Sequence, residues 1–257
     1  MIMKRTLYGM IILILVGCTD SKSPAELTFS PVFSTQKITC NTEIDIQDKK
    51  WNINQLQFYV SNVELKNSQD KWHKISLKIT PDQTGNIALL GRSCGETESG
   101  NWRLKFSHEI TLADYTAIRF SLGVPFEQNH LNPLEQPSPL NVSSMFWVWQ
   151  TGHKFARIEM SNNNDDWLFH LGSTGCKSPS VMRAPSNACL YTNFHNFEVE
   201  LDSSNKVIFD LANLLGSLPL SMAASCQSEQ NNLACQQLFT QLKQTGEQAI
   251  FRVDSVE

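Results

Sequence analysis

The stretch LQFYVSNVEL, Leu56–Leu65, decides the fold class of this chain. Leu56, Phe58 and Val60 alternate with other residues, and alternate residues of a β-strand point to the same face. After a local break, the apolar set continues to Leu65. The stretch predicts a β-strand with one buried face and an irregularity near its middle.

The same alternation recurs along the chain, and turn clusters such as Ser161–Asp166 separate the segments. These segments are Trp72–Ile79, Thr116–Val124, Lys154–Met160, Trp167–Gly172 and Asn196–Leu201. Repeated short strands with turn signals are typical of β-sandwiches and β-barrels. We therefore expect an all-β fold, a β-sandwich of the immunoglobulin type or a related one.

Helix is expected only as one or two short pieces near the C-terminus. Asp210 follows a strand that begins at Val207, and it can cap a short helix that stops at Gly216. Within Gln230–Gly246, leucines recur at the spacing of an amphipathic helix. The stretch AIFRVD, Ala249–Asp254, predicts a closing strand.

The N-terminus has the pattern of an export signal. Lys4 and Arg5 precede a short apolar run, Leu7–Val16, which is too short to span a bilayer. The run leads into Leu-Val-Gly-Cys18, which resembles the lipobox of bacterial lipoproteins, where the cysteine becomes the lipidated first residue. Thr19, not aspartate, follows, which by resemblance favours the outer membrane. A plain signal peptide is the alternative.

This interpretation divides the chain into a lipoprotein signal peptide at 1–17, a lipidated tether at 18–27 and a single domain at 28–257. We expect an outer-membrane lipoprotein that faces the periplasm or the cell surface. The formal net charge is −4, and the basic residues are scattered without a run or stripe. This distribution argues against nucleic acid as a partner.

The chain has seven cysteines, of which Cys18 belongs to the lipobox. The others are Cys40, Cys94, Cys176, Cys189, Cys226 and Cys235. An even number in an exported chain predicts disulfides, although sequence alone leaves their connectivity open. Local closure favours Cys176–Cys189 and Cys226–Cys235, which leaves Cys40 with Cys94. A thiolate metal site is the rival interpretation, weakened because no Cys-x-x-Cys pair exists.

Three of the six histidines have positions that suggest metal binding. His130 lies in a long irregular segment, Pro125–Ser144, and such loops in compact domains are often functional. His170 lies on a predicted strand ahead of a glycine-rich turn. His153 lies four residues after the second of two closely spaced tryptophans. Any single histidine is more often a surface or core residue than a ligand. Imidazoles from loops and strand ends can nevertheless hold copper, if the strands that carry them are neighbours.

The stretch MFWVWQTGHKF, Met145–Phe155, contains Trp147 and Trp149, which would face the same side of a strand. The simplest interpretation is that both indoles pack in the core. Indole itself is a poor metal ligand, because its nitrogen only donates hydrogen bonds. An oxidatively opened indole, kynurenine, differs in that its aniline nitrogen and ketone both carry lone pairs.

Four stretches, taken in order, resemble the MbnP family of exported copper-binding proteins, also called the metallo-mystery-pair four-Cys family. They are SLGVPFEQNHLNPLEQPSPLN at 121–141, MFWVWQTGHKFARIEM at 145–160, FHLGSTGC at 169–176 and FDLANLLGSLP at 209–219. The resemblance covers nearly all of the mature chain. Its specificity lies in the ordered set, since any single stretch would be a weak signal.

The resemblance implies a β-rich periplasmic or surface protein that binds a single copper ion. It also implies a partner, a di-haem enzyme similar to MauG and bacterial cytochrome c peroxidases, which oxidises a tryptophan to kynurenine. Carried onto this chain, the family pattern points to His130 and His170 as ligands. It points to Trp147 or Trp149 as the modified residue, without a choice between them.

The chain departs from the family pattern at His153. Where many relatives carry Gly-Tyr-Lys-Phe, this sequence has Gly-His153-Lys-Phe, so His153 either adds a ligand or replaces a buried tyrosine. Asn129 and Gln150 are candidates to orient the ligand imidazoles. The family name counts four cysteines, so six in this chain imply an extra bridge.

The expected function is copper acquisition, storage or handover by an exported lipoprotein that is not itself an enzyme. One alternative is a metal-free surface module, in which Trp147 and Trp149 stack on a glycan or contact a protein. A second alternative is a copper oxidase or oxygenase, which would need an open coordination position. No nucleophile elbow or phosphate-cradling glycine loop is present in the sequence.

Overall fold

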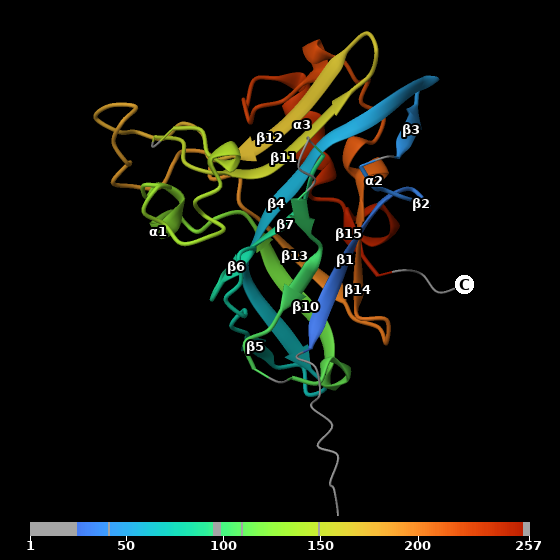
Figure 1. The fold of residues 1–257 in the computed structure, drawn as a ribbon, viewed down its shortest axis with the longest axis vertical. Coiled ribbons are helices and arrows are strands. Elements are labelled where there is room, and N and C mark those ends of the chain that lie inside the picture. Colours follow the sequence, from blue (N-terminus) through green and yellow to red (C-terminus); the bar gives the residue numbers. More distant parts are fainter. Residues whose placement is uncertain (1–24, 41, 95–98, 109, 149, 254–257) are drawn as a thin grey trace, which may run out of the picture.

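The computed structural model describes residues 25–40, 42–94, 99–108, 110–148 and 150–253. Its strands form two sheets, and the prediction of an all-β sandwich is confirmed (Figure 1). The predicted signal peptide, Cys18 and most of the tether lie outside the described residues. The last part of the predicted tether differs from expectation, because the first strand already begins at Glu26.

The larger sheet is built around one long strand, β4 (Lys49–Asn67), which contains the predicted strand Leu56–Leu65. The central path runs through β12 (Asp166–Gly172), β11 (Lys154–Ser161), β4, β10 (Tyr115–Leu122) and β13 (His195–Glu200). The strands β3 (Glu43–Ile46), β5 (Trp72–Lys74) and β7 (Ile87–Ser93) also pair with β4, and β6 (Gln83–Thr84) and β8 (Ser99–Asn101) pair with β7. Most of this sheet therefore depends on a single strand.

The predicted break in β4 is a bulge at Asn62. Asn62 has a φ of 52°, and the register between β4 and β10 shifts between Arg119 and Ser121. A bulge adds one residue to one strand and re-aims the side chains that follow. Val63 is buried directly after the bulge, so the apolar face of the strand continues.

The smaller sheet contains both ends of the described chain. Its order is β15 (Phe251–Arg252), β14 (Lys206–Asp210), β1 (Glu26–Phe33) and β2 (Gln36–Lys37), with β9 (Arg103–Lys105) also paired to β1. The β1–β14 pair is parallel and its other pairs are antiparallel. The sheet thus joins segments that lie far apart in the sequence.

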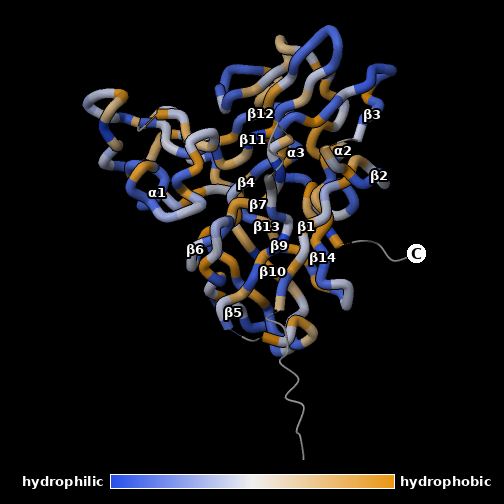
Figure 2. The backbone as a smooth tube through the Cα atoms, in the orientation of Figure 1, coloured by the Kyte–Doolittle hydropathy of each residue, from blue (hydrophilic) through white to orange (hydrophobic). Residues whose placement is uncertain are grey.

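Phenylalanines from both sheets form the centre of the core. Phe29 of β1 packs edge-on against Phe58 of β4 and Phe120 of β10, with ring centroids 6.3 and 5.6 Å apart. Phe251 of β15 contacts all three rings. Figure 2 shows hydrophobic stretches along strands in the middle of the molecule. Such edge-to-face pairs add to the stabilisation from buried area and hold the two sheets together.

The helices are short. The predicted pair near the C-terminus is present as α2 (Leu211–Leu215) and α3 (Leu233–Gln241), while the single turn α1 (Phe126–Asn129) was not expected. The remaining helical turns are 3₁₀ turns at Leu112–Asp114, Ser143–Met145, Met222–Ala224 and Gly246–Gln248. Among the described residues, no helix has the length and apolarity needed to cross a bilayer.

Two predicted elements differ in extent from the structure. The strand expected over Trp72–Ile79 ends at Lys74, because the chain then leaves the edge of β4 and Ile79 is exposed. The helix expected within Gln230–Gly246 ends earlier, at Gln241. Leu233, at its first position, is exposed and does not belong to the buried face.

The two disulfides favoured by local closure are present, and so is the pair that they leave over. They join Cys40 to Cys94, Cys176 to Cys189 and Cys226 to Cys235. The second pair closes the loop that follows β12. This loop lies beside α1, as the contact between Cys189 and His130 shows, and both stand to one side of the sheets (Figure 1).

Residues 123–148, 150–153 and 173–194 together make up what we call the site lobe. It is attached to the larger sheet at β4, where the Tyr59 hydroxyl donates to the Pro139 carbonyl over 2.9 Å. Gly123 also donates its backbone N–H to the Tyr59 carbonyl. Most of the candidate ligands of the sequence analysis belong to this lobe or to the strand end that leads into it.

Candidate metal centre

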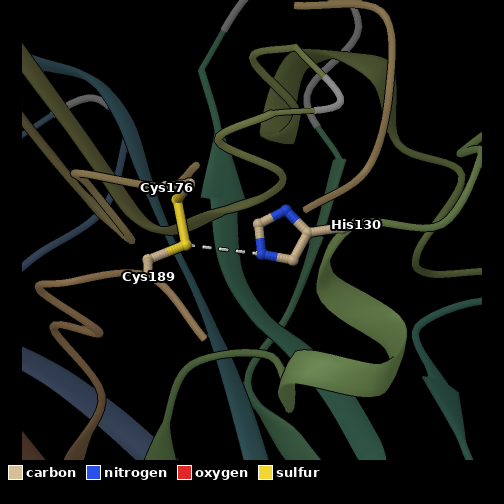
Figure 3. A group of neighbouring side chains, drawn as sticks. All are labelled: His130, Cys176 and Cys189. Atoms are coloured by element: carbon tan, nitrogen blue, oxygen red, sulfur yellow. Dashed lines mark hydrogen bonds between the residues drawn. A yellow bond between two sulfur atoms is a disulfide. The ribbon is translucent and has the colours of Figure 1, made fainter. Parts of the chain in front are cut away.

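His130 follows α1 directly and is buried, with only 4% of its surface exposed. Its ring points at the disulfide of the site lobe, with Nε2 3.7 Å from the sulfur of Cys189 (Figure 3). Nε2 also lies 3.2 Å from the amide nitrogen of Asn129. Asn129 thus contacts the His130 ring, while its predicted role in orienting a ligand stays a prediction.

The orientation of the Asn129 amide determines which nitrogen of His130 carries the lone pair. The Asn129 Oδ1 accepts a hydrogen bond of 2.8 Å from the backbone N–H of His153. The other end of the amide, Nδ2, can only donate, so Nε2 of His130 must accept. A metal bound at Nε2 would have to replace the Asn129 contact. His130 Nε2 consequently has a lone pair suited to a metal, but this lone pair already accepts a hydrogen bond from Asn129.

The sulfur atoms next to His130 are not thiolate ligands in this state. Donor atoms of His130, Cys176 and Cys189 all lie within 4.8 Å of one another, but the two cysteines are joined in a disulfide. Cys226 and Cys235 form a similar group with Glu229 and are likewise oxidised. Metal-binding cysteine requires the deprotonated thiolate. The rival interpretation of a thiolate site is therefore not supported by either group.

His170 has the clearest arrangement of a ligand. It lies on β12, and its Nε2 is 2.7 Å from Oε1 of Glu159 on β11. The carboxylate oxygen accepts a hydrogen bond, so Nε2 carries the proton and the lone pair of the ring lies on Nδ1. Nδ1 is buried and has no hydrogen-bond partner among the described residues. A carboxylate behind an imidazole, with the other nitrogen unpaired, is the arrangement seen at metal-binding histidines.

Glu159 is held in its ionised form. Burial by itself would raise the pKa of Glu159, but hydrogen bonds from His170 and Arg157, together with their charges, lower it to about 2. Arg157 donates from Nε and Nη2 to the two carboxylate oxygens, over 2.6 and 2.9 Å. The carboxylate therefore remains a charged acceptor for His170 at neutral pH.

Trp147 is the ring neighbour of His170, with the two ring centroids 6.4 Å apart. It belongs to no named strand; it follows the 3₁₀ turn Ser143–Met145 and lies next to the isolated bridge between Phe146 and His153. Its backbone N–H donates to the carbonyl of Gly152 over 3.0 Å. Trp149 lies outside the described residues, so its relation to the site stays a prediction.

His153 is buried completely and both of its ring nitrogens are engaged. Nδ1 lies 2.9 Å from the carbonyl oxygen of Asn129, and Nε2 lies 2.9 Å from that of Leu140. Burial lowers the pKa of His153, while these two carbonyl contacts oppose the effect. Neither nitrogen points to open space, so His153 has the contacts of a structural residue, and we leave it out of the proposed ligand set.

Gln150 contacts the disulfide loop instead of a candidate ligand. Its side-chain amide donates to the carbonyl of Cys176 over 3.1 Å. This contact ties the turn that contains Gln150 to the loop closed by the Cys176–Cys189 disulfide. No hydrogen bond recorded for the described residues joins Gln150 to a candidate imidazole.

The structure brings the candidates together in two contact groups. His130, Asn129 and His153 form one, and His170 and Trp147 form the other. His153 of the first group and Trp147 of the second belong to the neighbouring stretches 150–153 and 146–148. Sequence reasoning missed Arg157 and Glu159 of the stretch KFARIEM. Their spacing of two residues, away from the buried side of a strand, was the signal that could have marked them.

Comparison with known proteins now gives a family. The sequence model of the MbnP family matches residues 22–234. The chain belongs to the MbnP family. A solved structure, MbnP from Methylosinus trichosporium, is similar with a TM-score of 0.73 and 23% sequence identity. The match covers 84% of this chain and 87% of that chain, and supports the MbnP fold for the chain described above. A search of curated proteins finds no match.

Proposed function

We propose that this protein is an exported lipoprotein that binds a single copper ion and acts in copper acquisition or handling. The observation that carries the proposal is the buried Nδ1 of His170, which has no partner in the described part of the chain. Leaving such a group unpaired is costly unless something binds it. Membership of the MbnP family supports copper as that partner, and imidazole nitrogen is a suitable copper ligand.

The proposed ligands are His130 and His170, with a tryptophan-derived group as a further donor. In the metal-free structure Asn129 donates to the His130 nitrogen that copper would take, and Glu159 keeps the proton of His170 on Nε2. Bound copper would be coordinated by nitrogen atoms of these side chains. The chain itself has no catalytic role in this proposal.

The tryptophan-derived donor would be made by a di-haem, MauG-like partner that oxidises the indole to kynurenine. Trp147 is supported by its position beside His170, and Trp149 stays in the proposal as the second candidate. The glycan-stacking alternative is less well supported, because the Trp147 indole is half-buried and packs close to Gly172.

Copper titration into ligand variants tests the proposal. We expect His130→Ala and His170→Ala each to weaken copper binding by more than about a hundredfold, since removing a ligand costs more than removing its support. His73→Ala is the matched control, because the His73 side chain is exposed and hydrogen-bonds to Asn67. Unchanged stoichiometry and affinity in both ligand variants would contradict the assignment.

Peptide mass mapping of natively expressed protein tests the modification. We expect the peptide that contains Trp147 and Trp149 to carry the mass of one kynurenine. Co-expression without the di-haem partner is the control and should leave both indoles intact. Unmodified tryptophan in copper-loaded native protein would remove the kynurenine donor from the proposal.

A further inference from the structure

We propose that Arg157 is a positioning residue that fixes His170 and the Trp147 segment of the copper site relative to each other. It holds Glu159 against His170, and it holds the segment that leads to Trp147. This inference rests on the proposed function and deepens it, because it names the residue on which the relative placement of ligand and indole depends. Arg157 itself is not a metal ligand in this proposal.

The first connection passes through Glu159. The Arg157 guanidinium binds both carboxylate oxygens, and one of these, Oε1, also accepts from His170 Nε2. A bidentate pair fixes the plane of the carboxylate as well as its position. Fixing that plane fixes the direction of the His170 ring, so its buried Nδ1 keeps one orientation.

The second connection passes through Ser144. The third guanidinium nitrogen, Arg157 Nη1, donates to the Ser144 carbonyl oxygen over 3.3 Å. Lys154 Nζ donates to the same oxygen over 2.9 Å. Ser144 belongs to the 3₁₀ turn that precedes Trp147. Two cationic donors on one carbonyl therefore tie this turn to the outer side of β11.

The sheet register makes this double contact possible. Arg157 is directly opposite His170 in the β11–β12 pair, and Glu159 is two residues further along β11. Side chains that are opposite or diagonal on one face of a sheet are within reach of each other. The Arg157 and Glu159 side chains are only 21% and 24% exposed, so solvent weakens their pairing less than it weakens an open surface pair.

The first test uses metal-free protein and hydrogen exchange of backbone amides in residues 145–148 and 150–153. We expect Arg157→Gln to speed exchange there by about tenfold, because the turn loses its link to β11. Arg119→Gln is the matched control, since Arg119 pairs with Glu64 across β10 and β4. Unchanged exchange in Arg157→Gln would overturn the proposal.

Conservative variants separate bridging from charge alone. Arg157→Lys keeps the charge but loses the planar fork, so we expect it to restore little of the protection. Full restoration by lysine would show that bridging is not required, and the proposal would fail. In copper titrations, Glu159→Gln keeps an acceptor for His170 and should weaken binding less than Glu159→Ala.

Copper affinity distinguishes this inference from the proposed function. We expect Arg157→Gln to lower copper affinity by about tenfold or more, with little change in Arg119→Gln. Wild-type protein that binds no copper would overturn the proposed function. The exchange measurement would still decide whether Arg157 positions the Trp147 segment.

Discussion

Gly172, the last residue of β12, leaves room for the indole of Trp147. A Cβ atom added at Gly172 would lie 2.5 Å from Cζ3 of Trp147 and 2.9 Å from the carbonyl oxygen of His153. Its φ is not in the left-handed region, so the constraint is space and not backbone strain. A glycine in the motif FHLGSTGC thereby determines how closely Trp147 approaches His170.

Gly172→Ala is predicted to displace Trp147 and to destabilise the fold by about 1–3 kcal/mol, the usual cost of overpacking. Thermal unfolding and tryptophan fluorescence measure the two effects. Gly85→Ala is the control, because nothing lies within 4 Å of a Cβ at Gly85. Equal stability and fluorescence for Gly172→Ala and wild type would contradict the close packing.

His195, at the start of β13, is a second residue whose environment has a measurable consequence. Its Nε2 is buried without a hydrogen-bond partner among the described residues. Burial, and to a smaller extent the charge of Lys243, lowers the pKa of His195 to about 4. The folded state therefore resists protonation of this ring, whereas the unfolded chain accepts a proton near pH 6.5.

The sign of this effect is a loss of stability as pH falls. The unfolded chain binds more protons between pH 6.5 and about 4, so the contribution of His195 is intact above that window and is lost through it. His195→Gln should flatten the fall in unfolding free energy over this window, as measured by denaturant titration at several pH values. An unchanged slope would contradict the lowered pKa.

At the scale of elements, the junction of β14 and α2 joins local and distant contacts. The Asp210 side chain accepts from the backbone N–H groups of Ala212 and Asn213, which is the helix cap expected from sequence. The same carboxylate pairs with Arg252 of β15 over 3.0 Å. Asp210 is 3% exposed, so its charge is compensated by this cap, by this ion pair and by the backbone N–H of Ser34, which donates over 3.2 Å.

Asp210→Ala is predicted to cost about 2 kcal/mol or more, because it removes a cap and leaves Arg252 without this partner. Asn232→Ala is the matched control, since Asn232 caps α3 through the Cys235 N–H but carries no charge. We expect about 1 kcal/mol for the control. Denaturant unfolding of both variants measures the difference, and equal losses would show that the ion pair contributes nothing.

At the scale of the whole molecule, β4 and the disulfides join parts of the chain that are distant in sequence. β4 pairs with five other strands, β3, β5, β7, β10 and β11. The Cys40–Cys94 bridge links the segment that follows β2 of the smaller sheet to the end of β7 in the larger sheet. This bridge closes a loop of 54 residues, against 9 for Cys226–Cys235.

Removing the Cys40–Cys94 bridge by alanine at both positions is predicted to cost about 4 kcal/mol, from the entropy the long loop regains on unfolding. Removing Cys226–Cys235 in the same way should cost about 2.5 kcal/mol, because its loop is shorter. Denaturant unfolding of the two double variants gives the comparison. A larger loss for the shorter loop would indicate that native contacts, not loop length, dominate.

Local sequence pattern was sufficient for several strands of the larger sheet and for much of the C-terminal region. Alternation placed β4, β10 and β12, and Asp210 marked the start of α2. Strand alternation and capping involve neighbours within a few residues, so they can be identified without knowing the fold. The number of cysteines likewise predicted disulfides, and short loops suggested their pairing.

The hydrogen-bond partners of each imidazole could not be predicted from local sequence pattern. His170 differs from His153 because one nitrogen of His170 is unpaired among the described residues, while both nitrogens of His153 meet carbonyl groups. Those partners come from Glu159, Asn129 and Leu140, on other elements. Hydrogen bonds require contact within about 3 Å, and only the packing of sheet and site lobe brings such distant residues so close.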